Sequence, residues 1–130
     1  MGVARIEHET GSFAVVMEGL DRIWTMRHRV TVPYQSVISV AWDVHHAAAG
    51  PEGIRFPGTG FPGVITAGTY WRFWGEDRVR SFWLRGRDPR NCITVRLSDH
   101  AFDYITVEVA HPEAEVTRLT AAVQEHQRGG

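Results

Sequence analysis

Short segments in which apolar and polar residues alternate recur along almost the whole chain, and they restrict its fold more than any other feature. Alternation with a period of two is typical of strands that bury one face. Residues 75–77 supply turn chemistry that pairs two of these segments as a hairpin. We expect strands at residues 12–18, 28–32, 37–44, 64–74, 78–85, 92–97 and 104–109, and interpret residues 1–11 as a frayed end or a poorly formed edge strand.

The same alternation predicts which side chains face the core. In the segment at residues 37–44 the inward set is Ile38, Val40, Trp42 and Val44, and in the long segment at 64–74 one face carries Ile65, Ala67, Thr69, Trp71 and Phe73. The last two strands point their branched residues inward. These are Ile93, Val95 and Leu97 in the first, and Ile105, Val107 and Val109 in the second.

Helical spacing occurs at two places. Residues 111–127 form the convincing helix, because Pro112 suits the first helical position and Glu113 and Glu115 favour the positive end of the dipole. Residues 20–27 have the spacing of one short helix, which is too short to be stable unless it lies against a sheet. The apolar stripes are Val116, Leu119, Val123 and His126 in the long helix and Leu20, Ile23 and Trp24 in the short one.

Composition narrows the class of protein. The 130 residues show no linker or repeat, so we expect a single domain covering residues 1–130. One cysteine, Cys92, rules out an internal disulfide, and no apolar run has the length of a membrane span or a signal peptide, so we expect a cytoplasmic protein. A formal net charge of −1 gives no field that would attract nucleic acid.

The order of elements and several local motifs resemble the pleckstrin-homology-like (PH-like) fold, in particular an uncharacterised, actinobacterial-type group of bacterial PH-like proteins. The motifs are GLDRIWTM, RVTVPYQSVISVAW, GIRFPGTGFPGVITAGTY, SFW, and YITVEV before HPEAE. The resemblance implies a mainly β (α+β) chain in which about seven strands form two packed antiparallel sheets in a β-barrel-like arrangement, closed at one end by the C-terminal helix. His111 departs from the pattern, which usually has an acidic residue there.

A loop rich in glycine and proline, FPGTGFPG at residues 56–63, is the first candidate site. Its backbone N–H groups would form a nest for a phosphate, a carboxylate or a lipid head group, with Arg55 supplying positive charge. The spacing matches no nucleotide-binding motif, and a rigid crossover between two sheets explains the loop better. The candidate ligand-binding residues are Arg55, Gly58, Thr59, Gly60 and Gly63.

The second candidate is a basic and aromatic surface in the segment at residues 70–96, which holds seven arginines. Such a surface suits phosphate head groups, nucleic acid or an acidic peptide, and exposed aromatic residues in it would indicate self-association or a partner. Alternation along the strands would instead spread the arginines over a solvated face. The candidate interaction residues are Tyr70, Trp71, Arg72, Trp74, Arg80, Phe82 and Trp83.

Evidence for catalysis or a metal is weak. Asp43, His45 and His46 suggest a metal site, but neighbours on a strand point to opposite faces, so exposed loop histidines are the better interpretation. Cys92 has no reactive motif around it, although converging arginines would lower its pKa. An enzyme using His28, Asp43 or Tyr34 as acid or base in a barrel cavity has no paired groups to support it.

The sequence therefore predicts a non-catalytic binding or assembly module that uses no cofactor and no metal. We expect a protein partner or a homo-oligomer, with pairing of edge strands as the mode of contact and a membrane protein as one conceivable neighbour. The alternatives are a small anionic ligand or lipid head group near the glycine loop, and a small enzyme.

Overall fold

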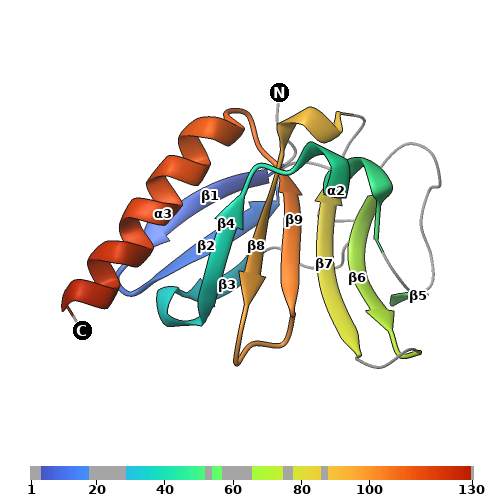
Figure 1. Cartoon of the computed structure of the whole chain (residues 1–130), viewed down its shortest axis with the longest axis horizontal. Helices are drawn as coiled ribbons and strands as arrows, with labels where there is room; N and C mark the ends of the chain where they lie inside the picture. The colour runs from blue at the N-terminus through green and yellow to red at the C-terminus, as the bar shows by residue number, and fades with distance from the viewer. Residues whose placement is uncertain are drawn as a thin grey trace.

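The computed structural model describes residues 4–17, 29–51, 54–56, 66–74, 78–85 and 88–129. Within them lie two sheets and a long C-terminal helix (Figure 1). The first sheet has the order β1-β2-β3, with β1 (Ala4–Glu9), β2 (Ser12–Met17) and β3 (Arg29–Pro33). The second has the order β4-β8-β9-β7-β6-β5, with β4 (Val37–Ala41), β5 (Ile54–Phe56), β6 (Thr66–Arg72), β7 (Val79–Arg85), β8 (Cys92–Leu97) and β9 (Tyr104–Glu108).

Short helical turns connect several of the strands. The 3₁₀ turn η1 (Tyr34–Ser36) joins β3 to β4 and so links the two sheets, while η2 (Pro89–Asn91) precedes β8. Helix α2 (Val44–Ala49) follows β4, and helix α3 (Pro112–Gly129) ends the fold. None of the described helices combines the length and apolar character that crossing a membrane requires.

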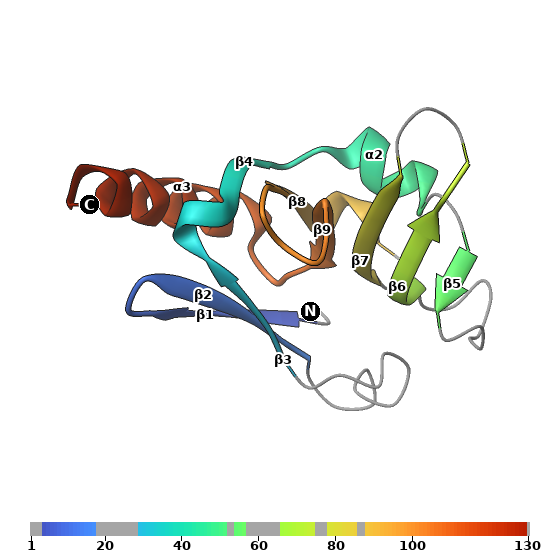
Figure 2. The same cartoon turned by 90° about the horizontal axis from the view of Figure 1, so that it is seen from below.

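The hydrophobic core lies between the two sheets and is covered at one side by α3. Figure 2 shows the first sheet crossing beneath β8 and β9, with α3 above it beside β4. The prediction for the last two strands is confirmed, because all six of their branched inward residues are buried. The stripe of α3 is confirmed too: Leu119 and Val123 are buried, and Val116 packs against the core.

Of the two interpretations of residues 1–11, the edge strand is confirmed and the frayed end is wrong for the described residues 4–11, because β1 is an edge strand of the first sheet. Strand β1 pairs with β2 from Ala4 opposite Met17 to Glu9 opposite Ser12. Gly11 turns the chain between them with a φ of 75°, which glycine adopts without strain. Ala4 and Ile6 are buried in the core, so β1 is held by packing as well as by its ladder.

The sheets are open rather than closed into a barrel, and one strand pair is parallel. Strand β9 lies between β7 and β8. It is antiparallel to β8 but parallel to β7, where Ser81 lies opposite Tyr104. The mainly β architecture and the C-terminal helix are as expected, but the second sheet is not purely antiparallel. The expected short helix at residues 20–27 lies outside the described residues.

The predicted strand at residues 37–44 is in fact a strand followed by a helix. A register shift between Val37 and Ser39 changes which face looks inward, so Val37 is buried and Ile38 is 65% exposed. Beyond Ala41, the carboxylate Oδ1 of Asp43 accepts a hydrogen bond from the backbone N–H of His46 at 3.0 Å. This N-cap starts α2 and ends the strand.

Candidate functional site

Three large aromatic side chains remain exposed at the end of β6. We call Trp71, Phe73 and Trp74 the aromatic tip; their exposed fractions are 36%, 50% and 51%. Trp71 and Phe73 make an edge-to-face contact with ring centroids 6.2 Å apart, and Phe73 and Trp74 make another at 5.4 Å. Through these edge-to-face contacts the three rings form one continuous apolar surface, which is unusual on a protein without a partner.

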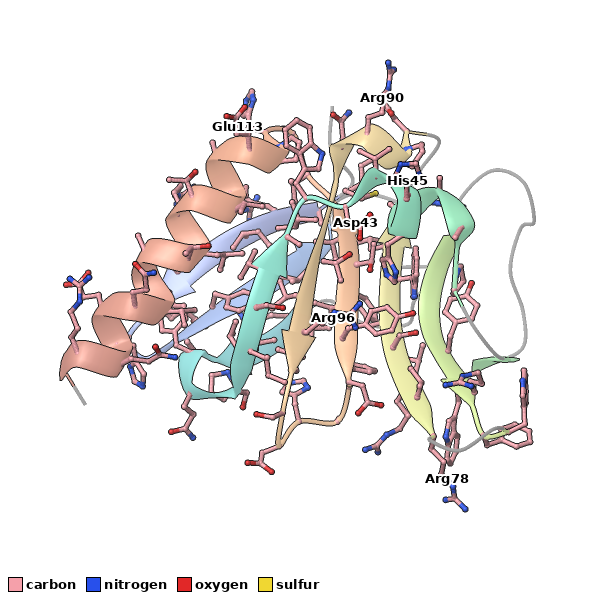
Figure 3. All side chains as sticks on the ribbon, viewed as in Figure 1. Asp43, His45, Arg78, Arg90, Arg96 and Glu113 are labelled. Carbon is pink, nitrogen blue, oxygen red and sulfur yellow. The ribbon has the colours of Figure 1, made fainter. Side chains whose placement is uncertain are left out.

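Arginines and a sheet edge border the aromatic tip. Arg72 donates from Nη1 to the carbonyl oxygen of Trp74 at 3.3 Å, and the exposed Arg80 lies opposite Trp71 in the β6–β7 ladder. Arg78 points away from the sheet beyond the same end of β7 (Figure 3). On its other side Trp71 lies opposite Ile54 of β5, the last strand of the sheet. The tip therefore continues into an edge strand.

Two residues predicted for the interaction surface are in the interior. Phe82 and Trp83 are both 0% exposed, because both faces of β7 are covered. Phe82 belongs to the core between the sheets, whereas Trp83 lies on the opposite face of the sheet, against His46 of α2. Tyr70 is half-buried. Of the aromatic residues predicted for the interaction surface, the exposed ones are therefore Trp71 and Trp74, at the end of β6.

Beneath α2 a layer of buried polar side chains covers the second face of the sheet. His46 Nε2 is 3.1 Å from the hydroxyl of Thr106, which is 3.0 Å from the hydroxyl of Thr94. The His46 ring stacks on Trp83 at 5.2 Å and meets Tyr104 edge-on at 5.0 Å. These contacts anchor α2 to the sheet, so we interpret His46 as a residue that stabilises the fold.

The expectation that His45 and His46 are both exposed loop residues was therefore wrong. They lie on a helix, where His45 is exposed, as Figure 3 shows, and His46 is partly buried. Asp43 caps that helix and joins neither ring in a site. Among the described residues no group of three or more His, Cys, Asp or Glu side chains is placed to hold a metal ion.

A groove lies between the β1–β2 turn, η1 and the C-terminal half of α3. We call it the histidine groove; its volume is about 530 Å³. His8 Nδ1 and the hydroxyl of Tyr34 are 2.7 Å apart, and the Tyr34 and His126 rings have centroids 6.0 Å apart. The full lining is His8, Gly11, Tyr34, Arg118, Ala121, Ala122, Glu125 and His126.

Burial and one neighbouring charge favour the neutral form of His8. Desolvation lowers the pKa of His8, the positive charge of Arg118 lowers it further, and Glu115 acts in the opposite direction. Desolvation also raises the pKa of Tyr34, so its hydroxyl stays protonated. In the described part of the chain, His8 Nε2 and Glu115 Oε2 are buried without a hydrogen-bond partner.

Of the two acid or base candidates that the structure describes, Tyr34 lies in this groove and Asp43 does not. It pairs with His8, not with Asp43, and His28 lies outside the described residues. His8 was not a candidate because residues 1–11 were interpreted as a frayed end or a poorly formed edge strand. The alternation of Ala4, Ile6 and His8 on one face was the available signal.

A second groove, of about 710 Å³, lies at the other end of α3. Its lining includes Trp42, Pro112 and Thr117, and the Trp42 indole is fixed by a hydrogen bond from Nε1 to the carbonyl oxygen of Arg90 at 2.7 Å. Trp42 is 46% exposed, contrary to the inward position expected for it. The chain leaves the strand at this point, so the alternation no longer applies.

The remaining candidate residues are placed as follows. Cys92 is buried, and burial, with the negative charge of Glu108, raises the pKa of its thiol to about 12, so converging arginines do not activate it. The backbone of Arg55 lies in β5. Gly58, Thr59, Gly60 and Gly63 lie outside the described residues. The anion-binding loop therefore stays a prediction.

Comparison of the chain with protein-family models, with curated proteins and with solved structures finds no match. Any function must therefore be argued from the residues themselves.

Proposed function

We propose that the chain is a non-catalytic assembly module that associates with a second copy of itself through the aromatic tip and the adjoining edge of β5. The observation that carries the proposal is the exposure of Trp71, Phe73 and Trp74 as one surface of contacting rings. Large aromatic side chains dominate the energy of protein interfaces because each buries a large apolar area.

Two further observations favour a second copy as the partner. In the described part of the chain β5 is the last strand of its sheet, and such an edge is where a strand from another molecule is added. Pairing of two β5 edges would bring two aromatic tips together, since Ile54 lies opposite Trp71.

Light scattering coupled to size exclusion tests the proposal. We expect the average mass to rise toward that of a dimer as the protein is concentrated to about 1 mM. W71S combined with W74S would shift this rise to higher concentration. I38S is the matched control, because Ile38 is a large exposed apolar residue on a different strand. A monomer at every concentration would refute self-association, as would an equal effect of the control.

The PH-like assignment stays a proposal too. The order of elements and the C-terminal helix on two sheets support it, whereas the parallel pair β7 and β9 and the open sheets depart from the arrangement that the resemblance implies.

A further inference from the structure

We propose that the histidine groove binds a small zwitterionic molecule that carries an aromatic ring, of the class of aromatic amino acids and short peptides containing one. This site is separate from the aromatic tip. The tip lies at the end of the β6–β7 hairpin, and the groove lies at the opposite end of the molecule, where the β1–β2 turn approaches the C-terminal half of α3 (Figure 1).

The helix side of the groove carries one positive and one negative side chain. Arg118 and Glu125 both line it, and because they are seven residues apart in α3 they are separated by two turns, about 10 Å along the axis. Between them the wall consists of Ala121 and Ala122, whose methyl groups leave the space open. A ligand lying along this wall would meet a cationic group at one end and an anionic group at the other.

The opposite side of the groove is built from rings. Tyr34 stacks with His8 at a centroid distance of 6.2 Å and meets His126 at 6.0 Å, so the three rings form one wall. An aromatic ring of a ligand would pack against them in an offset or edge-to-face arrangement. The groove volume of about 530 Å³ is in the range of small-molecule sites.

The charges around Arg118 favour a zwitterion over a simple anion. Glu115 already accepts a hydrogen bond from Arg118 Nη1 at 3.2 Å, and Glu125 places a second carboxylate in the groove two turns further along α3. A ligand with only a negative charge would gain from Arg118 and lose to both glutamates. An ammonium group near Glu125 removes that loss, and the neutral His8 does not oppose it.

Binding is tested by NMR titration of the whole chain with the dipeptide glycyl-phenylalanine, observing the imidazole signals of His8 and His126. We expect saturable shifts with a Kd near the millimolar range. Two related probes, the N-acetylated dipeptide and its C-terminal amide, each lack one charge. Each should bind about two- to fivefold more weakly than the intact dipeptide, as half-exposed ion pairs predict.

Charge variants then assign each end of the probe. R118Q should weaken the intact dipeptide two- to fivefold, about the cost of one such pair, and leave the C-terminal amide unchanged. E125Q should weaken the intact dipeptide and leave the N-acetylated form unchanged. R128Q and E113Q are the matched controls, because they change charge elsewhere on α3 without lining this groove.

Absence of a saturable shift at about 20 mM dipeptide would overturn the proposal. It would also be overturned if all three probes bound equally, or if R118Q and E125Q affected every probe alike, since binding would then not depend on paired opposite charges. These outcomes are independent of the light-scattering result.

Discussion

Truncation of Leu119 to alanine would test how α3 holds the two sheets together. The Leu119 side chain is 0% exposed and packs in the cluster that joins both sheets to the helix. Removing about three buried carbons forfeits roughly 2.4 kcal/mol of transfer free energy, at about 0.8 kcal/mol each. The cavity left behind adds to this, because strands and helix relax only in part. We therefore expect L119A to lower the free energy of unfolding by about 2 to 5 kcal/mol.

Urea unfolding followed by circular dichroism and tryptophan fluorescence measures this loss. The two signals should change together if the domain unfolds in one step. The control is Q124A on the exposed side of the same helix, which should change the free energy of unfolding by less than about 0.5 kcal/mol. If L119A lowered the free energy of unfolding by less than about 1 kcal/mol, the conclusion that α3 covers the core would be refuted.

Three further predictions concern buried polar groups. T106V removes the hydroxyl that contacts His46 and Thr94 and should lower the free energy of unfolding in urea by about 1 to 3 kcal/mol. The control T31V, at an exposed strand position, should lower it little. Equal effects of the two variants would contradict the buried polar layer. Because the thiol pKa of Cys92 is raised to about 12, iodoacetamide at pH 8 should label it only in urea, and rapid labelling of the folded chain would contradict its burial. The pKa of His8 is lower in the folded chain than in the unfolded chain, so the unfolded chain binds the proton first and the free energy of unfolding should fall as the pH drops through about 6.5. H8Q should flatten this part of the curve of unfolding free energy against pH. An unchanged slope would contradict the lowered pKa of His8.

The alternation of residues predicted most of the second sheet. Strands β8 and β9 both lie inside the second sheet, and the alternation correctly placed their branched residues on the face toward the core. It did not predict that residues between them, such as Thr94 and Thr106, are buried as well, on the face beneath α2. The same reasoning placed the β6–β7 hairpin and the apolar stripe of α3. These features follow from local spacing because the residues that share one face of a strand or helix recur at a regular interval along the chain.

Other features depend on which strands become neighbours, and local spacing does not contain that information. Phe82 and Trp83 were expected on a surface, but the core between the sheets covers one face of β7 and α2 covers the other, so both side chains are buried. The register shift beside Ile38 changes which residues of β4 face inward, and the N-cap at Asp43 replaces strand spacing with helical spacing. The histidine groove combines residues from β1, η1 and α3, which no motif links in the sequence.

A crystal structure that shows what surrounds Trp71, Phe73 and Trp74 would test the proposed assembly most directly. We predict a symmetric neighbour that pairs with β5 and buries the aromatic tip in an interface of more than about 1,000 Å². Aromatic tips that face solvent in every copy would contradict it.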